Sequence, residues 1–185
     1  MSQVQVGVKG GINIATVKYK VIGTNTASVG YNAGVLAQVR ITQDFFIRPE
    51  VQYSLKGYRY NTNSSSGTGT TRLNYVAVPL LAGFNIGDKF QGLIGPEFGF
   101  LVSANSVFAG NKQKISDVFE HFDWGLDLGA TYKITKALGA EVRYNFGFRG
   151  LIKGIVTEQN GGLSGSTKDG ANRVFQAGLY YLFVK

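Results

Sequence analysis

The chain has 185 residues and a mass of 20.0 kDa, and 44% of its residues are hydrophobic, 13% aromatic and 16% charged. This length and apolar content exclude a disordered chain and indicate one domain, which we expect to span residues 1–185. No window approaches the roughly 18 consecutive apolar residues of a membrane-spanning helix, and the 26 glycines argue against a helical bundle. The net charge of +8 comes from bases scattered singly, so the basic patch that nucleic-acid binding requires is missing, and cysteine is absent. An all-β class remains.

The first predicted strand starts almost at the N-terminus. From residue 4 to residue 14 the sequence alternates with a period of two, so that Val6 and Val8 fall on one face and Gly7 and Lys9 on the other. We interpret residues 1–3, which run directly into this pattern, as the start of an exported chain whose leader was replaced by a start Met.

Seven further strands are predicted from the same alternation. They cover residues 31–41, 45–58, 73–85, 90–103, 122–132, 138–149 and 172–183. The stretch 73–85 is apolar on both faces. There we place Val76, Val78, Leu80, Ala82 and Phe84 together on the apolar face.

The connections between these strands alternate in length. Three are short, at residues 42–44, 87–89 and 133–136, and four are long and polar, at residues 16–28, 61–70, 104–121 and 150–170. An up-and-down meander with both termini at the short-turn side produces this alternation. Bacterial outer-membrane barrels have the same asymmetry, with short periplasmic turns and longer extracellular loops. We therefore expect an eight-stranded antiparallel transmembrane β-barrel in the bacterial outer membrane.

The glycines decide which face of the sheet is concave. They share their strand face with the charged residues, and a narrow barrel holds long charged side chains only where the neighbouring side chains are small. The charged face then lines the lumen, and the aromatic and aliphatic face points outward into hydrocarbon. A soluble ligand-binding barrel would have the two faces reversed.

Eleven charged residues are expected to point into the lumen. The bases are Lys9, Arg40, Arg48, Lys56, Arg143 and Arg149, and the acids are Glu50, Glu97, Asp123, Asp127 and Glu141. Because an unpaired charge in a narrow lumen is costly, these groups should interlock as ion pairs and fill the interior. A lumen plugged in this way excludes a water-filled pore.

Several strand motifs resemble the PorT-like family of outer-membrane β-barrel proteins. They are GVKGGIN, PEVQYSLKGY, LNYVAVPLLAGF, GPEFGFLVSA, FDWGLDLGATYKI, EVRYNFG and the closing QAGLYYLF. The resemblance implies a Gram-negative outer membrane, a small barrel of eight strands and, as is usual in the family, no assigned enzymatic activity. Similar proteins often carry an acidic residue where Ala77 stands, and they often end on an aromatic residue, whereas Val184 and Lys185 follow Phe183 here.

A second group of bases lies in or beside the predicted long loops. Its members are Lys18, Lys20, Arg59, Arg72, Lys112, Lys114, Lys153, Lys168 and Arg173. Charge-assisted contacts with the phosphates of lipopolysaccharide are expected there, with simple solvation as the alternative. Outer-membrane lipid and lipopolysaccharide are thus the expected partners, together with another outer-membrane protein, while nucleic acid is not.

Two other functions stay open. One is a small passive channel of porin type. The other is a lipid-modifying enzyme at the rim, for which His121 is the only available base, with Asp117, Glu120 or Asp123 as its carboxylate and Ser103 or Ser106 as the nucleophile. A single His without Cys matches no metal-ligand spacing, and the glycines form no phosphate-binding fingerprint, so no catalytic residue, metal or cofactor is assigned.

Overall fold

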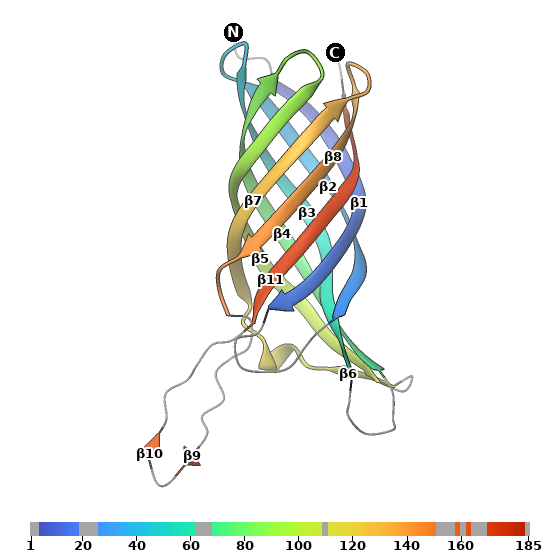
Figure 1. Ribbon diagram of the computed structural model, residues 1–185, viewed down its shortest axis with the longest axis vertical. Helices are drawn as coiled ribbons and strands as arrows, with labels where there is room; N and C mark the ends of the chain where they lie inside the picture. Colours follow the sequence, from blue (N-terminus) through green and yellow to red (C-terminus); the bar gives the residue numbers. More distant parts are fainter. Residues whose placement is uncertain are drawn as a thin grey trace.

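The computed structural model describes residues 4–18, 26–61, 68–108, 111–150, 158–159, 162–163 and 170–183. Eight long strands dominate it (Figure 1). They are β1 (Val4–Lys18), β2 (Thr26–Arg40), β3 (Phe45–Asn61), β4 (Thr68–Ile86), β5 (Phe90–Phe108), β7 (Phe122–Lys133), β8 (Leu138–Gly147) and β11 (Ala171–Leu182). Within the described part of the chain, no helix is long and apolar enough to cross a membrane.

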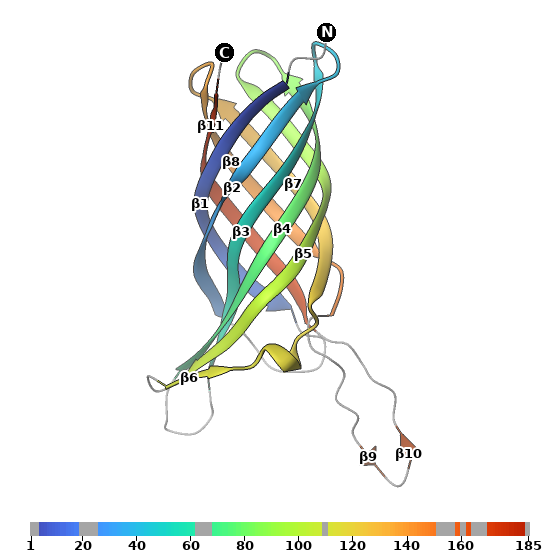
Figure 2. The ribbon, with the colours of Figure 1, turned by 180° about the vertical axis from the view of Figure 1, so that it is seen from behind.

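The sheet closes on itself. Each long strand pairs antiparallel with its neighbour along the chain, and β1 pairs with β11 from Gly7↔Leu182 to Lys18↔Ala171. Both described chain ends lie at the same end of the barrel as the three short turns (Figure 2). The predicted all-β, eight-stranded antiparallel up-and-down barrel is therefore confirmed.

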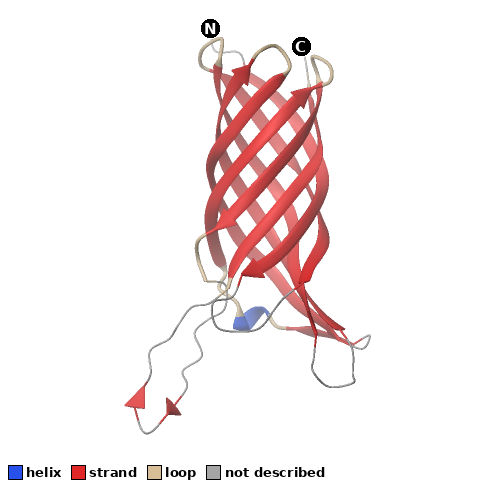
Figure 3. Ribbon diagram, in the orientation of Figure 1, coloured by secondary structure: helices blue, strands red, loops and turns tan. Residues whose placement is uncertain are grey.

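The opposite end carries the additional elements. Strand β6 (Asn111–Lys114) pairs with β5, the 3₁₀ turn η1 (Ser116–Val118) follows it, and the short strands β9 (Glu158–Gln159) and β10 (Gly162–Leu163) pair with each other (Figure 3). Strands β3, β4, β5 and β6 together form a ribbon that continues past the other strands. The outer part of this ribbon falls in the predicted loops 61–70 and 104–121, because its Ser, Thr and Gly residues hide the alternation while the backbone ladder continues.

The two faces of the sheet have opposite chemistry. Exposed apolar residues cover the outside, with Val51 50%, Trp124 45% and Phe175 40% exposed, whereas Arg48 and Arg143 inside are at most 1% exposed. This is the reverse of a soluble protein, and an apolar surface of this extent requires an apolar solvent around it. Outward aromatic residues pair across neighbouring strands, as in Phe90–Tyr132 and Trp124–Phe148.

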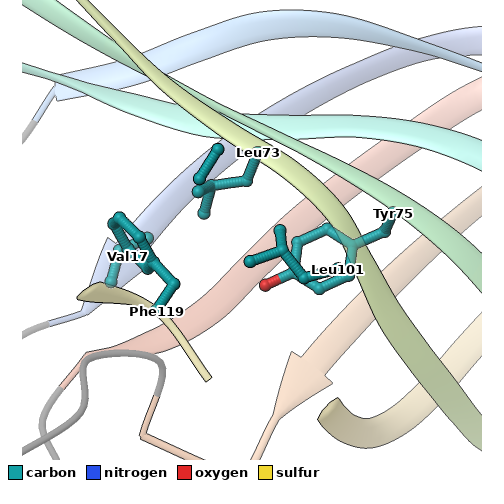
Figure 4. Close-up of a cluster of buried hydrophobic side chains, with 6 residues drawn as sticks. Val17, Leu73, Tyr75, Leu101 and Phe119 are labelled. Atoms are coloured by element: carbon teal, nitrogen blue, oxygen red, sulfur yellow. The ribbon is translucent and has the colours of Figure 1, made fainter. Parts of the chain in front are cut away.

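Apolar side chains also occupy both ends of the lumen. At the long-loop end, the outer cluster comprises Val17, Leu73, Tyr75, Leu101, Ala104 and Phe119, and Figure 4 shows Phe119 reaching back toward Val17 and Leu73. At the short-turn end, two smaller clusters comprise Leu36, Tyr180 and Leu182 and, separately, Phe46, Leu81 and Leu93.

Glycine permits the close approach of β1 and β11. Gly11 lies opposite Gly178 in the ladder, and a Cβ placed on Gly11 would overlap the carbonyl oxygen of Ala177 and lie 2.7 Å from the Cα of Gly178. Any side chain at this position would push the two strands apart. The seam that joins the first and last strands thus depends on glycine.

Candidate functional site: lumen and outer rim

Five charged side chains fill the middle of the lumen, and we name them the central cluster: Lys9, Arg48, Glu50, Glu141 and Arg143. Arg143 donates to Glu50 through Nη1 and Nη2, at 3.0 and 2.9 Å, and to Oε1 of Glu141 at 2.8 Å. Lys9 Nζ donates to Glu50 at 3.0 Å and to Glu141 at 2.7 Å. Arg48 Nη2 donates to Glu141 at 2.6 Å, and its Nε lies 2.8 Å from Glu50 without pointing its N–H at the oxygen.

These contacts span the barrel rather than joining neighbouring strands. Strand β3 carries Glu50 and β8 carries Arg143, and four steps separate these strands in the ring of eight in either direction. They are therefore diametrically opposite. The hydrogen bonds between Glu50 and Arg143 thus cross the lumen, so its width at this level is filled by the two side chains.

A second group of polar side chains lies between the central cluster and the outer cluster. Lys56 Nζ donates to Glu97 at 2.8 Å, and Gln52 Nε2 donates to the other oxygen of Glu97 at 3.1 Å. Asn172 Nδ2 donates to Asp123 at 2.6 Å. Lys56 also attracts Asp123 electrostatically.

Asp127 is a further acid bonded to the central cluster. It accepts a hydrogen bond from Asn145 Nδ2 at 2.7 Å and one from Arg143 Nη1 at 3.2 Å. Asp127 is 1% exposed, so these two donors replace the water that it would otherwise bind.

Two of the eleven residues predicted for the lumen lie at the ends of the barrel and not in its interior. Arg40 is the last residue of β2, and its exposed side chain stands at the short-turn mouth. Arg149 follows the end of β8, is half-buried and pairs with Glu120 at 3.2 Å. The alternating pattern continues past the ends of these strands, which explains both errors. The described lumen therefore holds four bases and five acids instead of six and five.

Four of the predicted loop bases lie on strands of the ribbon, and we name them the rim bases: Arg59, Arg72, Lys112 and Lys114. All four are exposed. Arg72 stands opposite Asn105, which stands opposite Lys114, and Arg59 and Lys112 are joined in the same way through β4 and β5. Residues opposite one another in a ladder project to the same face, so the four bases share one face.

That face is the outward one. Along β4, the exposed Arg72 has the same parity as the outward-facing Leu80 and Phe84, whereas the buried Leu73 has the other parity. From the strand spacing, Arg72 and Lys114 stand about 10 Å apart and Arg59 and Arg72 about 8 Å apart. Within the described part of β3 to β6, the only acids are Glu50 and Glu97, and both point into the lumen.

The remaining predicted loop bases are placed as follows. Lys18 is exposed at the end of β1. Arg173 is half-buried and donates to the carbonyl oxygens of Gly147 at 2.6 Å and Asn172 at 2.8 Å, so it fastens β11 to β8. Lys20, Lys153 and Lys168 lie outside the described residues.

The structure does not assemble a catalytic group around His121. Its side chain is exposed and forms no hydrogen bond or ion pair with the described residues, while Glu120 pairs with Arg149 and Asp123 lies inside the lumen with Asn172. Among the described residues, no group of three His, Cys, Asp or Glu side chains is arranged to hold a metal ion.

Comparison with known proteins identifies the architecture. The family model described as an outer membrane protein beta-barrel domain matches residues 1–153. The crystal structure of Neisserial surface protein A (NspA) is similar with a TM-score of 0.61 and 16% identity, over 96% of this chain and 97% of that one. No curated protein sequence matches.

The attachment invasion locus protein Ail of Yersinia pestis is also similar, with a TM-score of 0.54 and 14% identity, over 98% of this chain and 99% of that one. A second crystal structure of Ail, in complex with the heparin analogue sucrose octasulfate, gives a TM-score of 0.53 and 13% identity over the same shares. At these identities the likeness concerns the fold alone.

Proposed function

The chain belongs to the family of outer membrane protein β-barrel domains and resides in the bacterial outer membrane, and from this premise we propose that it is a closed, non-enzymatic barrel that binds lipopolysaccharide through its rim bases. The observation that carries the proposal is the set of four exposed bases on the outward face of the ribbon, without an acid beside them in the described strands.

The position of the rim bases matches the chemistry of the outer leaflet. They continue the apolar face of β4 toward the long-loop end, which is the extracellular end in barrels of this family. Headgroup phosphates lie immediately beyond the hydrocarbon. Arg and Lys donate charge-assisted hydrogen bonds to phosphate, and Arg does so with two parallel donors. A lipopolysaccharide molecule beside the ribbon is the partner that this face fits.

The filled lumen supports a closed barrel rather than a passive channel. The central cluster crosses the lumen, and apolar clusters lie on both sides of it along the barrel axis. An ion entering this lumen would have to displace buried side chains whose partners would then be left unpaired, which costs several kcal/mol per ion. We propose no enzymatic role, because the His121 side chain forms no hydrogen bond or ion pair with a described carboxylate.

The proposal also includes a narrower family assignment and a comparison of ligand chemistry. The seven strand motifs quoted above support membership of the PorT-like group, within the broader family that the family model identifies. Ail was crystallised with a polyanion, sucrose octasulfate, and the rim bases of this chain offer chemistry suited to polyanions. Another outer-membrane protein as a partner stays a prediction.

A rim variant and a control variant at the other end of the barrel test lipopolysaccharide binding. Arg72→Gln with Lys114→Gln removes two charges from the rim, and Lys89→Gln removes an exposed charge from the short-turn end. In calorimetric titrations of the refolded barrel with detergent-solubilised lipopolysaccharide, the rim variant should bind roughly twofold to thirtyfold more weakly, the range for two exposed charge pairs. The control should bind like the original chain. Equal effects of both variants, or none, would contradict the proposal.

A further inference from the structure

The short-turn end of the barrel contains a cavity that the proposed function does not use. Its volume is about 260 Å³, which is enough for a small ligand. Residues from the ends of β2, β3, β4, β5, β7 and β11 and from the turn after β7 line it, so it occupies the mouth of the lumen. We name it the vestibule. In barrels of this family the short-turn end faces the periplasm.

Three cations surround the vestibule: Arg40, Lys133 and Lys136. No acid is among the described residues that line it. Arg40 and Lys133 repel each other electrostatically, and the acid that partly offsets this repulsion at Lys133 is Asp88, an exposed turn residue outside the lining. Neither Arg40 nor Lys136 forms an ion pair within the described part of the chain. An anion entering the vestibule would relieve this repulsion.

Neutral groups hold one of the cations in place. Asn85 Oδ1 accepts hydrogen bonds from Lys133 Nζ at 3.1 Å and from Gln91 Nε2 at 2.9 Å, while Asn85 Nδ2 donates to the carbonyl oxygen of Gln43 at 2.8 Å. Thr131 then fixes Gln91 through a 3.0 Å bond to its Oε1. Because Lys133 spends one of its three donors on Asn85, two donors remain for a ligand.

The lining of the vestibule also includes Phe46, Tyr180 and Leu182. The Tyr180 ring lies 4.7 Å from the guanidinium carbon of Arg48, which belongs to the central cluster. The vestibule therefore ends at this layer. A ligand can enter from the periplasm and leave only by the same route.

We propose that the vestibule binds a small periplasmic anion through a phosphate or carboxylate group, with Lys133 and Lys136 as its principal contacts and Arg40 across the mouth. The shared chemistry is the acidic group itself, whether it comes from a free anion or from the headgroup of an anionic phospholipid in the inner leaflet. The apolar side chains among the lining residues favour an anion that also carries a small apolar part. This site is separate from the rim bases, which lie at the other end of the barrel.

Nuclear magnetic resonance in uncharged detergent micelles tests the site on the intact chain. Inorganic phosphate is added stepwise, with sodium chloride at equal ionic strength as the control. The chemical shifts of the backbone amides of residues 133–137 are followed. In a second arm, short-chain phosphatidylglycerol is compared with short-chain phosphatidylcholine. We expect saturable shifts at these amides with phosphate, with phosphatidylglycerol or with both, and the active probe identifies the source of the acidic group.

The variant Lys133→Gln with Lys136→Gln should weaken binding at least tenfold, whereas Lys89→Gln, which removes a lysine of the same barrel end that lies outside the vestibule, should leave it unchanged. Lys136→Gln alone provides a second variant that keeps the hydrogen bond between Lys133 and Asn85 and should still weaken binding. Absence of saturable shifts with both probes, or equal binding by the variants and the original chain, would overturn the proposal. Lipopolysaccharide binding by the rim bases would be unaffected by either outcome.

Discussion

Replacing Arg143 with Met should strongly destabilise the barrel. Arg143 donates two hydrogen bonds to Glu50, one to Glu141 at 2.8 Å and one to Asp127 at 3.2 Å, and it is 1% exposed. The Met side chain fills similar space but leaves the acids of the lumen two charges in excess of the bases, where the excess was one. Removing one partner of a buried ion pair costs about 3–5 kcal/mol, and we expect a loss of that size in the free energy of unfolding.

The loss should be shared unequally among the three acids. Glu50 and Glu141 retain the other bases of the central cluster, whereas Asp127 retains only the amide of Asn145. The double variant Arg143→Met with Asp127→Asn should therefore recover about 1 kcal/mol or more of the loss, in line with coupling energies between directly bonded residues.

Urea unfolding of the barrel refolded into lipid vesicles measures these changes. Trp124 is the single tryptophan and lies on the outward face, so its emission reports when the barrel leaves the lipid. Arg40→Met is the matched control, because Arg40 is exposed at the barrel mouth, and its free energy of unfolding should change by no more than about 0.5 kcal/mol. A loss below about 1 kcal/mol for Arg143→Met would refute the reasoning.

Three further predictions concern the packing of the barrel. Phe119→Ala empties a buried position of the outer cluster and should cost about 3 kcal/mol in the same urea assay, whereas a neutral result would mean that the cluster does not seal the barrel. Gly11→Ala forces β1 away from β11 and should slow folding and lower the unfolding midpoint. The gel migration of unheated samples would detect the smaller folded fraction, and unchanged migration would contradict the close approach of the two strands. Trp124 should be quenched by lipids with brominated acyl chains and protected from aqueous iodide, and the reverse pattern would contradict its outward position.

Most of this architecture could be predicted from the sequence, because the strands of a barrel wall alternate strictly between two chemical environments. Successive residues along a strand face the lumen and the lipid in turn. The strand and its two faces can therefore be recognised where glycines and charged residues, such as Gly95 and Glu97, alternate with aromatic residues, such as Phe98. The outward placement of Leu80 and Phe84 on the fourth strand also agrees with the structure.

The alternation shows which face of a strand a residue is on, but not where the residue lies along the barrel axis. The incorrect predictions for individual residues arise from this. Arg40 and Arg149 continue the inward pattern but stand where the strands end, so Arg40 lines the barrel mouth and Arg149 pairs with Glu120 instead of joining the central cluster. The inward apolar residues of β4, such as Leu73 and Leu81, went unnoticed because a strand that is apolar on both faces gives no contrast to read.

The ion-pair partners within the lumen could not be predicted from the sequence either. Glu50 meets Arg143 because their strands are opposite in a ring of eight and their residues stand at the same level, which depends on the stagger of every strand between them. The vestibule was not predicted for a similar reason. Lys133 and Lys136 come from one turn and Arg40 from another, and only closure of the barrel brings the turns around one cavity.

Electrical recording from a planar lipid bilayer tests the closed lumen most directly. Purified protein is inserted at moderate and high salt, with a porin of known conductance as a check that insertion is detectable. Because side chains cross the lumen at the central cluster and apolar layers lie on both sides of it, we predict no conductance steps above the noise of the bare bilayer. Reproducible steps of uniform size from the pure protein would contradict the account.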